Sequence, residues 1–273
     1  CKPVRDEMPL KRLLRSMLSQ GDAPATLPPG QRIYAVGDIH GRLDLLDELL
    51  ARISADDARR GAADTLLIFL GDLVDRGPHS CQVVDRLLKL HKSGRAARFL
   101  LGNHDEIFLR AAAGDSKAIR FLIRIGGKET IISYGISEEE YRHSSYDELA
   151  RSFAAHVPDA HRDFLSEFDD YVEFGDYLFV HAGIRPGIAL AQQKAADLRW
   201  IRGDFLSCRS SHGKIVVHGH SISEEVEVKK NRIGIDTGAF ASGKLSAVGL
   251  EGSDRWFLAA EGKPDDRWAK LSD

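Results

Sequence analysis

Two carboxylates and a guanidinium stand together in the stretch GDLVDRG at residues 71–77. The apolar run before it, at 66–70, predicts a buried strand. Asp72 is the first side chain beyond that strand and is placed to bind a metal ion, while Arg76 offers a planar fork for phosphate oxygens. Because glycine and aspartate are also ordinary turn residues, this stretch alone is equally typical of a simple turn.

Other predicted strands also end in side chains that could bind a metal ion. These strands lie at 32–36, 98–101, 177–180 and 214–217. They are followed by Asp38 and His40, by Asn103, by His181, and by His220. Helical spacing of apolar residues between the first strands predicts an α/β fold, and such folds bind ligands at the carboxyl ends of strands.

The predicted metal ligands combine carboxylate, imidazole and amide oxygen. They are Asp38, His40, Asp72, Asn103, His181 and His220. This mixture suits Mn²⁺, Fe or Zn²⁺ better than Ca²⁺, which prefers oxygen alone. The set is too large for one catalytic ion with open positions, whereas two divalent ions ~3.5–4 Å apart and bridged by one carboxylate would use it fully. Two such ions activate water and polarise a phosphoryl group.

Taken together, the motifs resemble those of PPP-type phosphoprotein phosphatases within the calcineurin-like metallophosphoesterases, and in particular the short bacterial and phage-lambda-like members. The signatures are GDIHG at 37–41, GDLVDRG at 71–77, GNHD at 102–105, HAG at 181–183, WIR at 200–202, GH at 219–220 and IDTG at 235–238. The resemblance covers about residues 32–250. It implies an α/β (α+β) sandwich of two mixed β-sheets flanked by helices.

The resemblance also implies a role for each candidate site residue. The first ion takes Asp38 and His40, the second takes Asn103, His181 and His220, and Asp72 bridges the two. His104 is then the acid that protonates the leaving oxygen, and Asp75 orients it. Arg76 and Arg202 bind the phosphate, with Asn103 and His104 beside them. The implied mechanism is direct attack on phosphorus by a metal-bound hydroxide, with Mn²⁺ as the expected metal.

The substrate implied by the resemblance is phosphoserine or phosphothreonine in a protein, with phosphotyrosine as a further candidate. Asp105 departs from the motif of phosphoprotein phosphatases, which usually have glutamate at this position. The related diadenosine tetraphosphatases usually have aspartate there. Those relatives, however, typically lack a pair like Asp75 and Arg76. Hydrolysis of dinucleoside polyphosphates is therefore the alternative. A metal-binding regulatory protein without turnover is a third reading, which the complete set of site residues disfavours.

Composition limits the kinds of partner that we expect. The 273 residues are 43% hydrophobic and carry a net charge of −3, which gives no general attraction to nucleic acid. No run approaches the ~20 apolar residues that a membrane span needs. Three cysteines without zinc-type spacing fit a reducing cytoplasm. We expect a cytoplasmic monomer.

The chain is predicted to divide into an N-terminal arm and linker at 1–30 and one metallophosphatase domain at 31–273, with a helical insertion at about 105–175. The pattern at 11–18 predicts a basic amphipathic helix that packs on its own domain or contacts a membrane or partner. The first residue is Cys1, which is typical of a trimmed chain and, less often, of a processed lipoprotein. Ser80 is expected to cap a helix, and Asp236 to brace a turn at the site.

Overall fold

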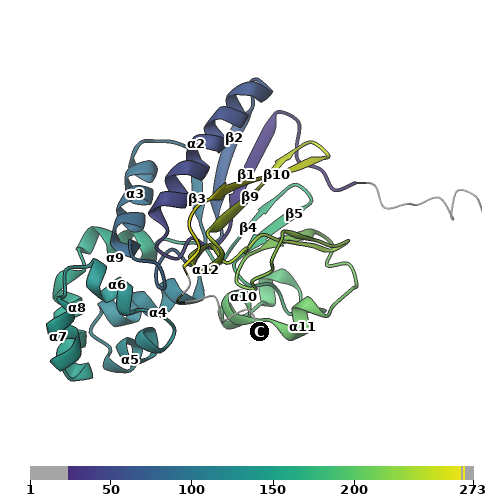
Figure 1. The fold of residues 1–273 in the computed structure, drawn as a ribbon. Coiled ribbons are helices and arrows are strands. Elements are labelled where there is room, and N and C mark those ends of the chain that lie inside the picture. The colour runs from purple at the N-terminus through teal and green to yellow at the C-terminus, as the bar shows by residue number, and fades with distance from the viewer. Residues whose placement is uncertain (1–23, 266, 268–273) are drawn as a thin grey trace, which may run out of the picture.

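The computed structural model describes residues 24–265 and Arg267, and the helix predicted at 11–18 lies outside them. Two five-stranded sheets pack face to face, and helices cover their outer sides (Figure 1). The expected α/β sandwich of two mixed sheets is therefore confirmed. The division into arm and domain stays a prediction. Within the described part of the chain, no helix combines the length and the apolar character needed to cross a bilayer.

The first sheet has the strand order β10-β9-β1-β2-β3. Its strands are β1 (Gln31–Val36), β2 (Asp64–Phe69), β3 (Ala97–Phe99), β9 (Lys244–Glu251) and β10 (Asp254–Glu261). β1, β2 and β3 run parallel, and β9 and β10 form an antiparallel pair. Because parallel strands end at the same edge, the residues that follow β1, β2 and β3 gather there.

The second sheet has the order β4-β5-β6-β8-β7. Its strands are β4 (Tyr171–Phe174), β5 (Tyr177–Val180), β6 (Ile215–His218), β7 (Glu227–Val228) and β8 (Arg232–Gly234). The three central strands are parallel, and β4 and β7 are antiparallel edges. Neither edge strand is predicted from the sequence: β4 falls within the stretch expected to be mostly helical, and β7 has only two residues.

Three groups of helices surround the sheets. α2 (Leu43–Arg60) and α3 (Ser80–Lys92) connect the parallel strands of the first sheet. A helical block follows, made of α4 (Asn103–Ala112), α5 (Ser116–Arg124), α6 (Lys128–Ser133), α7 (Glu138–His143), α8 (Tyr146–His156) and α9 (Asp159–Ser166). The short helices η1 (Leu190–Gln192), α10 (Ala195–Trp200), α11 (Gly203–Leu206) and α12 (Ala239–Ser242) come later. In Figure 1 the block and the pair α10 and α11 lie on opposite sides of the strand ends.

Alternation of side chains along β1 explains why both faces of the first sheet are covered. Tyr34 and Val36 join the core beneath the helices, whereas Ile33 and Ala35 join a second core between the sheets. Phe179 enters that second core from β5 and is fully buried. Truncating such a side chain to alanine typically costs about 3–5 kcal/mol, so the sandwich holds the strand ends firmly in place.

Candidate metal centre

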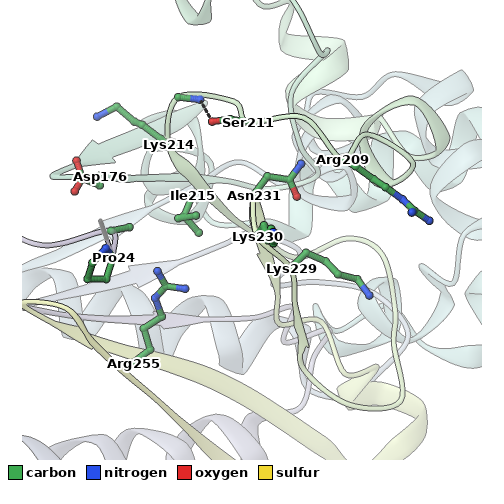
Figure 2. A pocket seen from close by; sticks show the side chains of 12 residues that line it. Pro24, Asp176, Arg209, Ser211, Lys214, Ile215, Lys229, Lys230, Asn231 and Arg255 are labelled. Carbon is green, nitrogen blue, oxygen red and sulfur yellow. Dashed lines mark hydrogen bonds between the residues drawn. The ribbon is translucent and has the colours of Figure 1, made fainter. Parts of the chain in front are cut away.

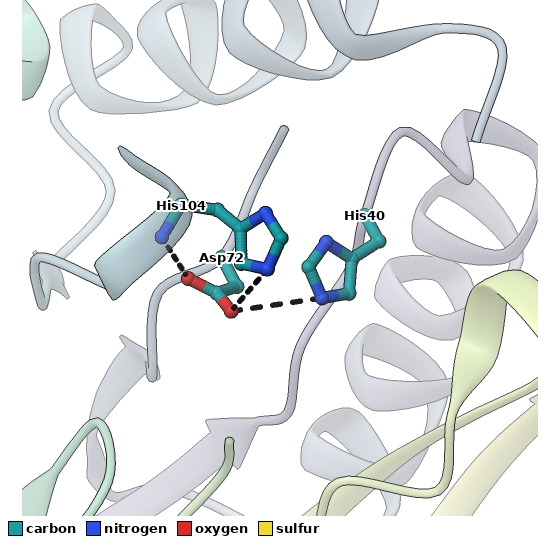
Figure 3. A group of neighbouring side chains, drawn as sticks. All are labelled: His40, Asp72 and His104. Carbon is teal, nitrogen blue, oxygen red and sulfur yellow. Dashed lines mark hydrogen bonds and ion pairs between the residues drawn. The ribbon is translucent and has the colours of Figure 1, made fainter. Parts of the chain in front are cut away.

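Asp72, directly beyond β2, stands at the middle of the strand ends and presents its two oxygens to different neighbours. Its Oδ2 lies 3.6 Å from Nε2 of His40 and 3.9 Å from Nε2 of His104. Figure 3 draws these three side chains, with dashed lines from Asp72 to both histidines. Its Oδ1 lies 3.5 Å from Nε2 of His181. Two groups of potential ligands therefore share this one carboxylate: His40 and His104 on one side, and His181 with His220 on the other.

The remaining two predicted ligands adjoin these groups. Both oxygens of Asp38 accept from the backbone N–H of His220, at 3.2 and 3.0 Å. Asn103, the first residue of α4, places its Oδ1 3.0 Å from Nε2 of His181. The structure thus brings all six predicted ligands together from four strand ends and one helix start, and it also places His104 within reach.

The imidazoles are held with one nitrogen aimed at the cluster. Nδ1 of His40 donates to the carbonyl of Val74, and Nδ1 of His181 donates to the carbonyl of Leu70, each at 2.7 Å. Burial lowers the pKa of both rings and lowers that of His220 to about 2, so all three are neutral at pH 7. A neutral imidazole whose far nitrogen is fixed by a carbonyl is the form that binds a metal ion.

Two features show that the residues fit divalent cations. Because Nδ1 of His181 carries its proton, Nε2 of this ring and Oδ1 of Asn103 present lone pairs to each other at 3.0 Å. The pKa of the buried Asp38 is raised by burial and by the nearby carboxylates of Asp236 and Asp72. Facing lone pairs and crowded buried carboxylates are both stabilised by a cation.

The backbone is strained at this site. Five non-glycine residues in the described part of the chain have positive φ: His40 (47°), Asp72 (51°), Asp75 (73°), Arg76 (71°) and His220 (62°). All five are predicted site residues. Such conformations cost about 1–3 kcal/mol each and persist where the surrounding structure imposes them, typically at functional sites.

Two glycines make room for the carboxylates. A Cβ on Gly102 would lie 2.1 Å from Oδ1 of Asp72, and a Cβ on Gly219 would lie 2.0 Å from Oδ1 of Asp38. Either contact is too close for any side chain. The glycines of the GNHD and GH motifs are therefore explained by the close approach of the backbone to a ligand carboxylate.

His104 and Asp75 form the pair that the resemblance implies. Nδ1 of His104 donates to Oδ2 of Asp75 at 2.7 Å, which leaves Nε2 facing the cluster. Oδ1 of Asp75 accepts from the Thr130 hydroxyl at 2.8 Å, and the backbone N–H of Asp75 donates to Thr130 and to Ser80. Both hydroxyls were missed as site residues: Ser80 is the first residue of α3 and supports Asp75, instead of capping the helix as predicted.

The two arginines reach the cluster from different elements. Arg76 donates to Nε2 of His40 and to Nε2 of His104, each at 3.0 Å, and its guanidinium lies 4.4 Å from the centre of the Phe240 ring. Arg202 donates to Nε2 of His220 at 3.1 Å. Neither arginine forms an ion pair with a carboxylate of the described residues, so both charges are available to an anion.

Two further aspartates support the surrounding turns. Asp105 accepts from the backbone N–H groups of Leu73 and Gly102, at 2.9 and 3.2 Å, which ties the second motif to the third. Burial and the charge of Asp72 raise the pKa of Asp105 to about 7. Asp236 accepts from the N–H of Gly238 at 2.9 Å, as expected of a residue that braces a turn.

A cavity of about 690 Å³ lies beside the second sheet and away from the metal ligands (Figure 2). Its lining includes Arg209, Lys214 and Lys230 but none of the predicted site residues. This cavity is therefore separate from the candidate metal centre.

The sequences of several relatives align with parts of this chain. The symmetrical bis(5'-nucleosyl)-tetraphosphatase of Acidovorax ebreus (strain TPSY) is 36% identical over 154 residues, which are 56% of this chain and 44% of that relative. The asymmetrical enzyme of Halalkalibacterium halodurans is 26% identical over 233 residues, which are 78% of this chain and 87% of that relative. The match to the first relative thus spans less than half of its length.

Solved structures share the fold. One described as a putative diadenosine tetraphosphatase superposes with a TM-score of 0.60 at 23% identity and covers 88% of this chain and 100% of its own. A cold-active protein tyrosine phosphatase gives a TM-score of 0.55 at 18% identity and covers 85% of this chain and 81% of its own. The family model described as calcineurin-like phosphoesterase matches residues 31–247, most of the chain. This protein therefore belongs to the calcineurin-like phosphoesterase family of metallophosphoesterases.

Proposed function

We propose that this metallophosphoesterase hydrolyses dinucleoside polyphosphates. The observation that carries the proposal is the likeness to relatives named bis(5'-nucleosyl)-tetraphosphatases, of both the symmetrical and the asymmetrical kind. These names favour the alternative substrate of the sequence analysis over phosphoproteins. Asp105, in place of the glutamate usual in phosphoprotein phosphatases, supports the same choice.

The site supports phosphoester hydrolysis assisted by two divalent ions, for which we propose Mn²⁺. One ion would be held by Asp38 and His40, the other by Asn103, His181 and His220, and Asp72 would lie between them. When bound, the ions supply positive charge for the phosphoryl oxygens and acidify a water molecule.

The protein's own residues bind the phosphoryl group and move a proton. Arg76 and Arg202 converge on the cluster from opposite sides, so their guanidinium groups are placed to bind the phosphoryl oxygens, beside Asn103 and His104. Nε2 of His104 faces the same space, and in the doubly protonated ring its proton can pass to the departing oxygen. Asp75 fixes the ring through Nδ1 and stabilises its charged form.

Protein phosphatase activity is a second candidate, because one specific feature favours it. The pair Asp75 and Arg76 resembles the central motif of phosphoprotein phosphatases, and both side chains lie in the site through contacts to His104. The geometry at the reacting phosphate serves either substrate.

A substrate panel with Mn²⁺ tests the proposal. It would compare kcat/KM for diadenosine tetraphosphate, p-nitrophenyl phosphate, and peptides with phosphoserine, phosphothreonine or phosphotyrosine. We expect diadenosine tetraphosphate to have the highest kcat/KM. Chromatography of its products would distinguish symmetrical cleavage, which gives ADP alone, from asymmetrical cleavage, which gives ATP and AMP. A higher kcat/KM for any of the phosphopeptides would make the protein a phosphatase of proteins instead.

A further inference from the structure

α5 carries three cations along one exposed stripe. Lys117, Arg120 and Arg124 are spaced three and four residues apart, so they lie on the same side of the helix. They line a cavity of about 620 Å³ together with Phe121, Ile123 and Tyr146. This volume falls within the range of roughly 300–1,000 Å³ that is typical of small-molecule sites. We call these six residues the α5 surface.

The described residues supply no ion-pair partner for the charges of the α5 surface. Within the described part of the chain, none of its three cations forms an ion pair with a carboxylate. Cations just outside it do: Arg110 pairs with Asp115 at 2.7 Å, and Lys128 pairs with Glu138 at 3.5 Å. Three unpaired positive charges in a protein of net charge −3 make a local site for an anion.

Aromatic rings accompany these charges. Tyr146, the first residue of α8, is 48% exposed, and the guanidinium of Arg120 lies 5.7 Å from the centre of its ring. The guanidinium of Arg124 lies 4.5 Å from the centre of the Phe121 ring. Exposed aromatic rings and guanidinium planes are the surfaces on which nucleobases stack. The α5 surface therefore offers contacts for both a phosphate and a base.

The C-terminal end of α5 lies beside the metal centre. The carbonyl of Gly126, two residues beyond Arg124, accepts from the backbone N–H of Arg76 at 2.8 Å. The Phe121 ring lies 6.0 Å from the Trp200 ring, centre to centre, and Trp200 comes two residues before Arg202. At 1.5 Å per residue, the cationic stripe extends about 10 Å along α5 from this end.

We infer that the α5 surface binds the second nucleotide of the substrate, the half that is not attacked at the metal centre. This assignment rests on the proposed function, because only a substrate with two nucleotide ends occupies both places at once. The ligand class is a nucleoside phosphate: its phosphates meet the cations of α5, and its base meets Tyr146 and the guanidinium planes. An acidic peptide would form ion pairs with the cations of α5 but would offer no planar group to stack on the aromatic rings.

Removing two of the charges tests this inference. The double variant Arg120→Ala/Arg124→Ala should lower the ratio of kcat/KM for diadenosine tetraphosphate to kcat/KM for p-nitrophenyl phosphate by about tenfold or more. The loss should fall mainly on KM, since these groups are remote from the reacting phosphate. Tyr146→Ala should lower the same ratio.

The matched control is Arg59→Ala. The side chain of Arg59 is 75% exposed near the end of α2, far from the strand ends, so the ratio should not change. A ratio in the double variant that stays within about twofold of the wild type would overturn the inference. So would a loss seen with phosphopeptides but not with diadenosine tetraphosphate, because the α5 surface would then serve peptides.

A second readout keeps the inference separate from the proposed function. ADP should inhibit hydrolysis of p-nitrophenyl phosphate by the wild type more strongly than inorganic phosphate does, and the double variant should lose that advantage. If the wild type does not cleave diadenosine tetraphosphate, the proposed function fails, and ADP inhibition then decides whether the α5 surface binds a nucleoside phosphate at all. Equal inhibition of wild type and double variant by ADP would refute it.

Discussion

Replacing Gly219 by alanine should disturb the metal centre through a single methyl group. The new Cβ would lie 2.0 Å from Oδ1 of Asp38. Gly219 is not among the glycines with positive φ, so alanine adopts its backbone conformation without strain and the effect is purely one of contact.

The size of the effect follows from the distances. Nonbonded carbon and oxygen atoms stay about 3.3 Å apart, so the carboxylate of Asp38 has to move by more than 1 Å. It is 2% exposed and held by the N–H of His220, and the methyl group pushes it out of that position. A misplacement of about 1 Å in a catalytic site typically costs ~10²-fold in rate.

The assay is kcat/KM for p-nitrophenyl phosphate with Mn²⁺, together with metal content and thermal unfolding. We expect a loss of about 10²-fold for Gly219→Ala in a folded protein, accompanied by weaker metal binding. Gly203→Ala is the matched control, since a Cβ there meets no atom within 4 Å. It should behave like the wild type.

Wild-type kcat/KM in Gly219→Ala would refute the placement of Asp38 in the metal centre. An equal loss in Gly203→Ala would show that the glycine substitutions act through the fold and not through Asp38. The thermal scan would show whether Gly219→Ala is unfolded at the assay temperature. In that case Gly102→Ala repeats the test on Asp72, because a Cβ on Gly102 would lie 2.1 Å from Oδ1 of Asp72.

Three further substitutions test the residues around the reacting phosphate. His104→Asn should lower kcat for hydrolysis of a phosphoserine peptide by about 10²–10⁴-fold and kcat for p-nitrophenyl phosphate far less. The reason is that a departing serine alkoxide needs a proton from the acid, whereas nitrophenolate leaves without one. Equal losses on both substrates would exclude a role of His104 as the acid. Thr130→Val removes the hydroxyl that donates to Asp75 at 2.8 Å. It should lower the free energy of unfolding, measured by denaturant titration, by about 1–3 kcal/mol and should also lower kcat. An unchanged free energy of unfolding would contradict a buried hydrogen bond between Thr130 and Asp75. Arg76→Ala should reduce kcat/KM by ~10²–10³-fold with metal content intact; unchanged kcat/KM would remove Arg76 from phosphate binding.

Much of the site could be predicted because its residues follow strands. Apolar runs mark β1, β2 and β5, and the polar residues after them are fixed to one region by parallel pairing. Asp72 illustrates this: its place beyond β2 makes it a candidate, and the potential ligands that follow the other strands distinguish it from an ordinary turn residue.

The supporting residues could not be found in this way. Thr130 lies on α6, 55 residues from Asp75, and a threonine in a helix gives no local signal of a distant partner. Ser80 was predicted in the wrong role: serine is suited to capping a helix, but its hydroxyl accepts from the backbone N–H of Asp75 instead. β4 and β7 were missed since edge strands this short show little periodicity. The cytoplasmic location and monomeric state stay predictions.

The most direct test of the account is a Mn²⁺ titration of metal-free protein, with hydrolysis of p-nitrophenyl phosphate and bound metal measured on the same samples. The shared position of Asp72 between two ligand groups predicts no activity without metal and full activity with two ions bound per chain. In Asp72→Asn, both the metal content and the activity should fall together. Full activity in the metal-free protein, or two ions retained at wild-type affinity in Asp72→Asn, would contradict the account.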